Sequence, residues 1–306
     1  MAEVKLLDQA QAPVETRYYA WHWHHQSATI AYDLRGEGPP ILLLPALSSI
    51  STRVELNTVA ATLAQHYEVV TLDWPGFGES DRPAWRTRPA IYHALLKDFV
   101  QDIVPGLAGL VAAGHSTGYA LALATDGSTI PQLRAIALMA PTWRGPLPTA
   151  MGNHRWAYSL LRWLVWCPVV GQALYALNAH PTFLRWMMSR HVYSDAAHIT
   201  PELMQAKHQT TQTKGARFAS AAFVTGGLDP VQQRTDWLDL MQVVTVPKLV
   251  IVGQQSPPKS KAEMEMLSAM AGVKSAMAPG SLGLGEEYSE EALAILLPFL
   301  ARHLAD

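Results

Sequence analysis

Short segments rich in apolar residues constrain the fold of this chain more than any other feature. They occupy residues 41–44, 68–73, 110–113, 134–139 and 248–252. A strand that is apolar on both sides needs cover on both faces, as in a parallel sheet between two layers of helices. Stretches with the helical spacing of apolar residues separate them, at residues 54–66, 92–103, 119–125, 263–271 and 289–304. The alternation predicts an α/β fold with a mostly parallel central sheet, flanked by helices through right-handed crossovers.

The chain also shows a different pattern at its start and in its middle. Residues 18–25 and 28–34 alternate between apolar and polar side chains, which predicts an antiparallel hairpin before the first buried strand. Residues 142–225 contain no buried strand and carry tryptophans and methionines on helical stretches. We therefore expect a core of residues 1–141 and 226–306, with residues 142–225 inserted as a helical cap over the strand ends.

Charge and cysteine content exclude several classes of function. Lys and Arg number 23 and Asp and Glu 25, so the net charge is −2 and a nucleic-acid partner is not expected. Cys167 is the only cysteine, which excludes an intrachain disulfide and a cysteine zinc site. Residues 1–14 lack the basic and apolar regions of a secretory signal, so the expected compartment is the cytoplasm.

One segment approaches the length of a membrane span. Residues 156–177 are largely apolar, but Arg162, Pro168, Gly171 and Gln172 interrupt them. We expect a buried or membrane-touching lid here rather than a span. Peripheral membrane association through the cap therefore stays open.

Gly114-His115-Ser116-Thr117-Gly118 is a complete G-x-S-x-G sequence. It follows an expected strand and precedes an expected helix, which is the context in which this motif presents a nucleophilic serine. Glycines on either side allow a tight turn, and the hydroxyl would stand near the positive end of the helix. The motif predicts that Ser116 is an exposed nucleophile on a strained turn.

With this motif the chain resembles the α/β-hydrolase fold superfamily, from about Arg17 to its end. Residues 73–80 (DWPGFGES) look like the D-x-x-G-x-G-x-S turn after the fourth strand of that superfamily, and residues 246–253 look like its seventh strand. Residues 42–48 (LLLPALS) stand where a strand is usually followed by His-Gly, with Pro45 in place of the histidine. The resemblance implies an oxyanion hole formed by the N–H of Thr117 and that of Ala46 or Leu47.

The positions of the other triad members are not filled in the usual way. By the resemblance, Ser256 occupies the place of the acid, and Leu282 or Gly285 the place of the histidine. The alternative acid position after the sixth strand, in residues 140–145, holds no carboxylate. His115 is expected to be a packed core residue. The substitutes left open are Glu286, Glu287 and the cap histidines His154, His180, His191, His198 and His208.

Other features indicate which ligands to expect. His22 and His24 share a strand face, but no carboxylate lies nearby in sequence, so we expect neither a metal site nor a cofactor. Gly76-Phe77-Gly78 lacks the remainder of a nucleotide loop. We expect part of the cap's aromatic set to line an elongated apolar pocket with Ser116 at its floor, namely Trp143, Trp163, Trp166 and Trp186.

The leading hypothesis for function is hydrolysis, or acyl transfer, at an ester of a bulky lipophilic molecule through Ser116. One alternative is a catalytically silent ligand-binding or scaffold protein that has lost the acid and the histidine. Another is a non-hydrolytic, lyase-type enzyme on the same fold. The sequence leaves the substrate, the base and the oligomeric state open.

Overall fold

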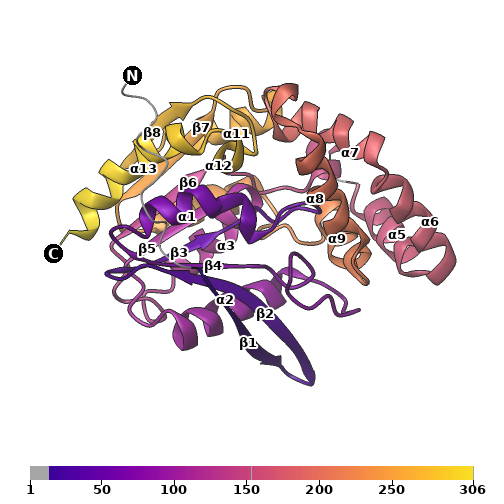
Figure 1. Ribbon diagram of the computed structural model, residues 1–306, viewed down its shortest axis with the longest axis horizontal. Coiled ribbons are helices and arrows are strands. Elements are labelled where there is room, and N and C mark those ends of the chain that lie inside the picture. The colour runs from indigo at the N-terminus through magenta and orange to yellow at the C-terminus, as the bar shows by residue number, and fades with distance from the viewer. Residues whose placement is uncertain (1–13, 153, 306) are drawn as a thin grey trace.

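The computed structural model describes residues 14–152 and 154–305 (Figure 1). The expectation about a secretory signal rests on residues 1–14, almost all of which lie outside the described residues. The described chain contains an eight-stranded sheet in the order β1-β2-β4-β3-β5-β6-β7-β8. The strands are β1 (Glu15–Trp23), β2 (Gln26–Arg35), β3 (Pro40–Leu44), β4 (Glu68–Leu72), β5 (Gly109–Ala113), β6 (Ala135–Met139), β7 (Lys248–Gly253) and β8 (Val273–Ala278).

The sheet is mostly parallel, as the apolar segments predicted. β1 pairs antiparallel with β2 and β2 with β4, while β4, β3, β5, β6, β7 and β8 pair in parallel. Every residue of β5, β6 and β7 is buried, so these three strands need the cover on both faces that their composition indicated. The expected hairpin before β3 is confirmed by the register of β1 and β2, which turns at His24 and His25.

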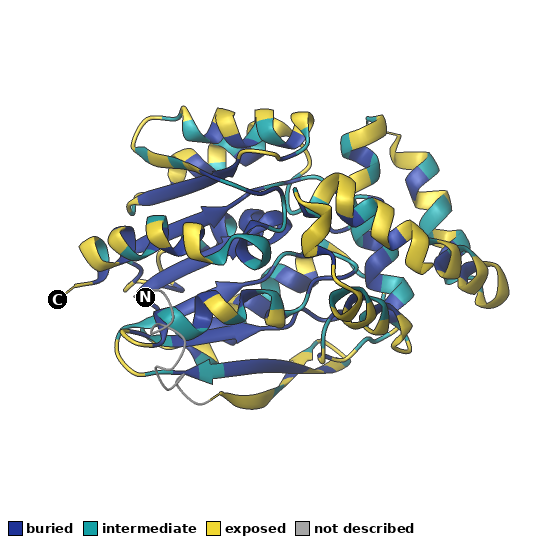
Figure 2. Cartoon of the chain, turned by 45° about the horizontal axis from the view of Figure 1, so that its top comes forward, coloured by how far each residue is buried: buried dark blue, intermediate teal, exposed yellow. Residues whose placement is uncertain are grey.

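Two groups of helices cover the sheet. In one group α1 packs against α13, and in the other α3 packs against both α2 and α10. Figure 2 shows the strands buried between these layers. The core helices are α1 (Asn57–Leu63), preceded by the 3-10 turn η1 (Arg53–Leu56), α2 (Pro89–Ile103), α3 (Thr117–Ala124), preceded by η2 (Gly114–Ser116), α10 (Arg234–Val243), α11 (Pro258–Ser268), α12 (Leu284–Glu287) and α13 (Ser289–Leu304).

Helices alone occupy the described chain between β6 and α10, beside the carboxyl ends of the strands (Figure 1). The stretch that approached a membrane span forms two helices, α5 and α6, that meet at 108°. Within the described residues no single helix is long and apolar enough to cross a membrane. The elements of this region are α4 (Pro146–Met151), α5 (Arg155–Trp166), α6 (Pro168–Asn178), α7 (Pro181–Met187), η3 (Met188–Val192), η4 (Ala196–His198), α8 (Pro201–Gln212) and α9 (Ala216–Val224).

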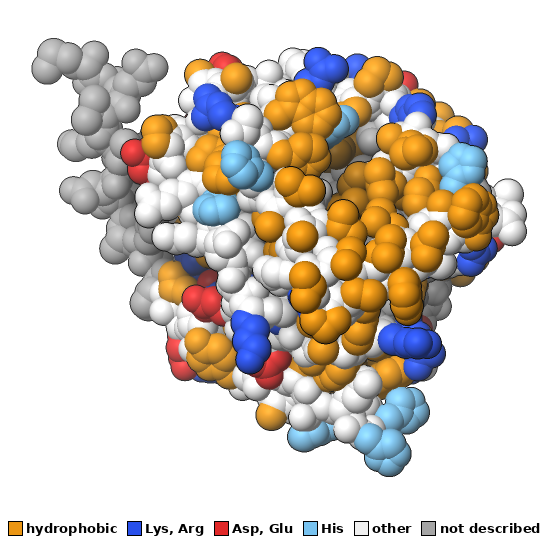
Figure 3. Space-filling model, turned by 90° about the vertical axis from the view of Figure 1, so that its right-hand side faces the viewer, with side chains coloured by type: hydrophobic (Ala, Val, Ile, Leu, Met, Phe, Trp, Pro, Cys, Tyr) orange, Lys and Arg blue, Asp and Glu red, His pale blue; other side chains and the backbone are white. Residues whose placement is uncertain are grey.

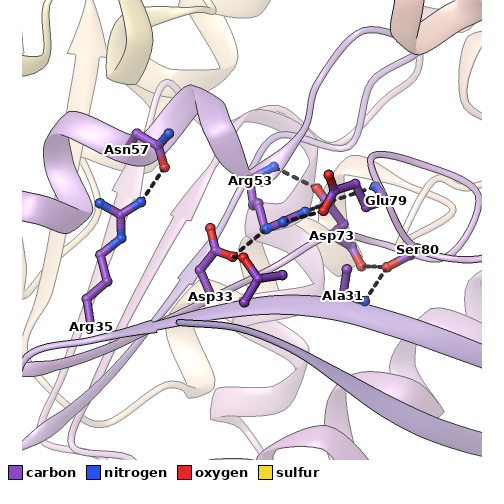
Figure 4. A network of polar contacts seen from close by, with 9 residues as sticks. Ala31, Asp33, Arg35, Arg53, Asn57, Asp73, Glu79 and Ser80 are labelled. Carbon is purple, nitrogen blue, oxygen red and sulfur yellow. Dashed lines mark hydrogen bonds and ion pairs between the residues drawn. The ribbon is translucent and has the colours of Figure 1, made fainter. Parts of the chain in front are cut away.

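A buried arginine fastens the start of the sheet to the turn after β4 (Figure 4). Arg53, which is 6% exposed, forms ion pairs with Asp33 of β2 at 2.9 Å and with Glu79 at 2.6 Å, and a third with Asp73. The N–H groups of Arg53 and Glu79 also donate to the Asp73 carboxylate, at 2.7 and 2.8 Å. This network holds η1, and hence the loop after β3, against the strand ends.

The D-x-x-G-x-G-x-S turn depends on a glycine. Gly78 has φ +52°, and a Cβ there would lie 2.0 Å from the Asp73 carboxyl carbon. The Ser80 hydroxyl donates to the Asp73 carbonyl at 2.7 Å and accepts from the N–H of Ala31 at 2.9 Å. A side chain at residue 78 would therefore displace the carboxylate that binds Arg53.

Candidate functional site

The turn from β5 into α3 is the place where this fold presents a nucleophile, and its corner residue is Gly114. Gly114 has φ +53°, the only left-handed residue of residues 109–124. Ser116 has φ −68° and ψ −16°, which is ordinary right-handed helical backbone. A Cβ on Gly114 would lie 3.1 Å from the Cβ of Ala46, so the corner faces the loop after β3. The residue at the strained position has no side chain.

Ser116 itself lies inside the protein. It is 0% exposed, and its hydroxyl donates to the carbonyl of Ala113 at 2.7 Å and is 3.2 Å from that of Leu44. The expectation of an exposed hydroxyl on a strained turn is therefore wrong. The physical reason is the position of the left-handed turn residue. It lies at Gly114, two residues before the position that the motif predicted, so Ser116 faces the ends of β3 and β5.

Two of the expected oxyanion donors are already hydrogen-bonded within the chain. The N–H of Ala46 donates to Oε1 of Glu55 at 2.7 Å. The N–H of Thr117 donates to the Gly114 carbonyl as part of the helical turn. The side chain of Leu47 is buried. An oxyanion could use the first two N–H groups only by displacing these acceptors, which corrects the expected hole at Thr117 and Ala46.

The expected acid and histidine positions lie close together at the ends of β7 and β8. A Cβ on Gly253 would lie 2.7 Å from the Ser256 hydroxyl and 2.8 Å from the Ser281 carbonyl. Ser256 is buried and its hydroxyl has no hydrogen-bond partner in the described chain. Leu282 is half-buried, and a Cβ on Gly285 would lie 2.9 Å from Leu56. These positions hold no side chain able to take a proton from a serine.

The histidines considered as substitute bases have other surroundings. As expected, His115 is packed in the core: it is 2% exposed, and its Nε2 lies 3.0 Å from the Leu228 carbonyl. His198 contacts Glu287 at 3.1 Å and His208 contacts the Ala179 carbonyl at 3.2 Å. His180 accepts from the N–H of Thr182 at the start of α7, and His154 and His191 are exposed.

His115 forms a buried pair with a residue that the motif analysis missed. Its Nε2 lies 3.4 Å from Oδ1 of Asp229, which also accepts from the N–H of Gly145 at 2.7 Å. Burial lowers the pKa of His115 to about 4 and raises the pKa of Asp229 to about 7. Both shifts favour the neutral forms, so between about pH 4 and 7 this pair joins the segment after α9 to η2 without a buried charge.

A second cluster lies above the ends of β3 and β8, where α8 meets the core. Glu55 of η1, Lys207 of α8 and Glu286 of α12 come together from three distant parts of the chain. Lys207 is buried and its Nζ lies 2.8 Å from Glu286, which also accepts from the Tyr193 hydroxyl at 2.6 Å. Burial raises the pKa of Glu55 to about 7, with Lys207 opposing the shift and Glu286 adding to it. We call Glu55, Lys207 and Glu286 the strand-end cluster.

Glu287 holds the helical region onto the core. Its side chain is 0% exposed and accepts from the N–H groups of Ser194 and Asp195, at 2.9 Å each, and from the Ser194 hydroxyl at 3.0 Å. Glu286 and Glu287 were among the substitutes left open for the missing base. They are instead the residues through which α12 binds the segment after η3, next to the expected histidine position.

Comparison with known proteins agrees with this fold. The alpha/beta hydrolase family matches residues 41–283, most of the chain. The chain belongs to this family. Uncharacterized proteins of Mycobacterium tuberculosis and Mycobacterium bovis are 31% identical over 112 residues, 37% of this chain. That match spans only 30% of the length of these curated relatives.

Solved structures of other proteins with this fold superpose over nearly the whole chain. Cfl2 from Burkholderia cenocepacia has a TM-score of 0.72 at 18% identity and covers 95% of this chain and 97% of its own. A thermophilic esterase from Thermogutta terrifontis has a TM-score of 0.71 at 19% identity, and the match covers 95% of this chain and 100% of the esterase chain. The enol-lactonase from Burkholderia xenovorans has a TM-score of 0.65 at 17% identity, and the match covers 90% of this chain and 97% of the lactonase chain. At such identities the likeness establishes the fold, and the chemistry depends on the site.

The four tryptophans expected to line a pocket differ in how far they are buried. Trp163 is 61% exposed and Trp186 is 53% exposed, so most of their surface faces solvent. Trp166 is half-buried against Phe218, with ring centroids 4.8 Å apart. Trp143 is buried and borders a cavity of about 400 Å³ that also contacts Arg144, Arg234 and Lys259. Trp163 and Trp186 therefore do not enclose a pocket above Ser116, because their indoles point outward.

Metal ligation finds no support among the residues that the structure describes. No group of three or more His, Cys, Asp or Glu side chains in residues 14–152 and 154–305 is placed to hold an ion. His22 lies on β1, but the strand ends at Trp23 and His24 lies in the turn that follows, so the expectation that these two histidines share a strand face is wrong.

Proposed function

We propose that this member of the alpha/beta hydrolase family is a binding or scaffold protein that forms no acyl-enzyme at Ser116. The observation that carries the proposal is the left-handed corner at Gly114. Nucleophilic catalysis requires a side chain at that corner and a base beside it. Glycine supplies no nucleophile, and Ser116 is enclosed with its hydroxyl bonded to main-chain carbonyls.

Changes at the other catalytic positions support the same proposal. The Ala46 N–H is bonded to Glu55, and the positions expected to hold the acid and the histidine carry Ser256, Leu282 and Gly285. Glu287 ties the neighbouring loop to the helical region. Polar contacts that hold the molecule together thus occupy the place where a family enzyme keeps a triad and an oxyanion hole.

Ester hydrolysis tests the proposal. We expect the wild type to hydrolyse p-nitrophenyl butyrate at the rate of buffer, and we expect the same of Ser116→Ala. Ser128→Ala, which alters an exposed serine, is the matched control for handling and folding. A wild-type rate well above buffer that Ser116→Ala removes and Ser128→Ala keeps would overturn the proposal.

One observation favours a second candidate, a proton-transfer enzyme that does not hydrolyse its substrate. Glu55 has a pKa of about 7, close to the pH at which a general base works best, and it lies beside the Lys207–Glu286 pair. Such a carboxylate could remove an acidic proton from carbon next to a carbonyl group. The arrangement needs no serine.

Proton exchange distinguishes this candidate from a silent protein. In D₂O, NMR would follow the loss of the methylene proton signals of acetylacetone. The second candidate requires exchange faster than buffer in the wild type and in Glu265→Gln, an exposed control, but not in Glu55→Gln. Exchange at the buffer rate in all three proteins would favour the silent protein.

A further inference from the structure

The outward face of α5 is apolar, which is the reverse of the usual surface helix. Trp156, Leu160 and Trp163 follow the i, i+4, i+7 spacing of one helix face, and they are 76%, 50% and 61% exposed. The inward face packs through Tyr158 and Val165, which are buried against the rest of the molecule. The helix is therefore held in place while its second apolar face stays in contact with solvent.

The neighbouring helices extend this apolar surface. On α6, Val169, Val170 and Leu177 are 82%, 49% and 70% exposed, and on α7 Phe183 and Trp186 are exposed. Figure 3 faces this side of the molecule and shows hydrophobic side chains gathered over one broad area, with Lys and Arg around it. A soluble monomer seldom exposes a contiguous apolar area of this breadth without a partner for it. We call the outward surface of α5, α6 and α7 the apolar face.

The geometry of α5 and α6 fits an interface rather than a span. The two helices together have the length and composition of a membrane span, but they bend by 108° where Cys167 and Pro168 join them. Neither helix alone is long enough to cross a bilayer. A bent pair whose inner sides are anchored to the protein can place its outer sides in the headgroup region.

Charge supports a lipid surface as the occupant. Residues 142–225 contain eight Lys and Arg and only two acidic residues, a net charge of +6 in a chain whose total is −2. Arg155, Arg185, Arg190 and Lys214 are exposed. Basic side chains around an apolar, tryptophan-bearing surface are attracted to anionic lipid, and indole rings favour the membrane interface.

The same charge argues against a second copy of the chain as the occupant. Face-to-face pairing would bring together two regions of like net charge, which is unfavourable for association. An anionic bilayer has the opposite sign and offers apolar contact to all three helices at once.

We infer that the apolar face docks on an anionic membrane surface, with α5, α6 and α7 in the headgroup region and the sheet outside the bilayer. This inference is independent of whether the protein has a catalytic activity. It places Trp156, Trp163 and Trp186 in lipid while the buried core tryptophans stay in protein.

Vesicle binding tests the inference with the whole chain. We expect the wild type to co-sediment with vesicles of phosphatidylcholine and phosphatidylglycerol. Binding to vesicles of phosphatidylcholine alone should be weaker. Binding to the anionic vesicles should weaken as the salt concentration rises. Brominated acyl chains should quench part of the tryptophan emission. Trp163→Asp combined with Val169→Asp should lower the partition coefficient by about tenfold or more, since each change places a charge in the interface.

Matched variants keep the test decisive. Val243→Asp alters a similarly exposed apolar residue on α10 and should bind as the wild type does. Arg190→Glu with Lys214→Glu should weaken binding to the anionic vesicles and leave the weak binding to phosphatidylcholine unchanged. Thermal unfolding without lipid should be alike in all variants, because these side chains are exposed.

Three outcomes would overturn the inference. One is that the wild type binds neither kind of vesicle. Another is that the Trp163→Asp, Val169→Asp variant and the Val243→Asp variant bind equally. The third is a concentration-dependent dimer that the apolar-face variant abolishes and that vesicles do not dissociate, which would make this surface an interface between two copies of the chain.

Discussion

The main-chain N–H of Ala46 donates to the carboxylate of Glu55 at 2.7 Å. An amide at this point of the fold is available in a hydrolase for the oxyanion of a tetrahedral intermediate. Here a carboxyl group of the same chain occupies it. Glu55 is thus both a structural acceptor and a member of the strand-end cluster whose pKa is raised by burial.

Glu55 should make stability depend on pH in a defined direction. Its pKa is raised from 4.5 to about 7 in the folded protein, so the folded state holds a proton that the unfolded state has released between those values. Stability from this group is present below pH 4.5 and is lost as pH rises to 7. Relative to Glu55→Gln, the wild type should lose up to about 3 kcal/mol of unfolding free energy over this window, measured by urea denaturation. Equal pH profiles for the two proteins would contradict this assignment.

His115 should act in the opposite direction. Its pKa is lowered from 6.5 to about 4 by burial, so the unfolded state takes up a proton that the folded state refuses between those values. Stability from His115 is complete above pH 6.5 and falls by about 3 kcal/mol as pH falls to 4. Glu55 and Asp229 titrate in the opposite direction over this range in both proteins, so the loss is measured as the difference in unfolding free energy between the wild type and His115→Gln. Guanidinium denaturation at several pH values should show the wild type losing about 3 kcal/mol relative to His115→Gln between pH 6.5 and 4. The prediction fails if this difference is the same at both pH values.

Gly114→Ser should destabilise the protein by about 1–3 kcal/mol, because a serine there must adopt a left-handed backbone and press on Ala46. Gly127→Ser is the control, since a Cβ at Gly127 meets nothing within 4 Å. Thermal unfolding of the two variants measures the difference. Equal stability of Gly114→Ser and the wild type would show that the corner is not constrained as described.

Arg53→Met should cost about 3–5 kcal/mol of stability, because it leaves the buried carboxylates of Asp33 and Asp73 without their cation. Arg17→Met removes an exposed pair with Glu15 and should leave the denaturation midpoint unchanged. A small effect of Arg53→Met would mean that water or proton uptake compensates the two carboxylates. It would also show that the Arg53 ion pairs are not what holds the loop after β3 in place.

Much of the fold could be predicted because burial on both faces leaves a clear trace in sequence. Residues 110–113 and 249–252 are apolar at every position since helices cover both sides of β5 and β7. The outward orientation of α5 could not be read in the same way. An apolar stripe such as Trp156, Leu160 and Trp163 has the same spacing whether it faces a core or a solvent-exposed surface.

The geometry of the candidate site could not be predicted from the sequence, for a different reason. The letters Gly114 to Gly118 match a nucleophile motif, but they do not specify at which residue the strand ends. Glycine adopts positive φ without steric cost whereas serine does not, so backbone sterics favour a corner at Gly114 over one at Ser116. Glu55 was missed for another reason, because its partners Ala46, Lys207 and Glu286 come from distant segments that only the folded chain brings together.

The reactivity of Ser116 distinguishes a silent binding protein from a serine hydrolase. Intact-mass spectrometry after incubation with a fluorophosphonate reports whether any serine has become covalently phosphonylated, and peptide mapping identifies which one. We predict that the wild type gains no adduct under conditions that fully label an active serine hydrolase. An adduct located on Ser116, present in the wild type and in Ser128→Ala but absent from Ser116→Ala, would show that Ser116 is an activated nucleophile and that the protein is not silent.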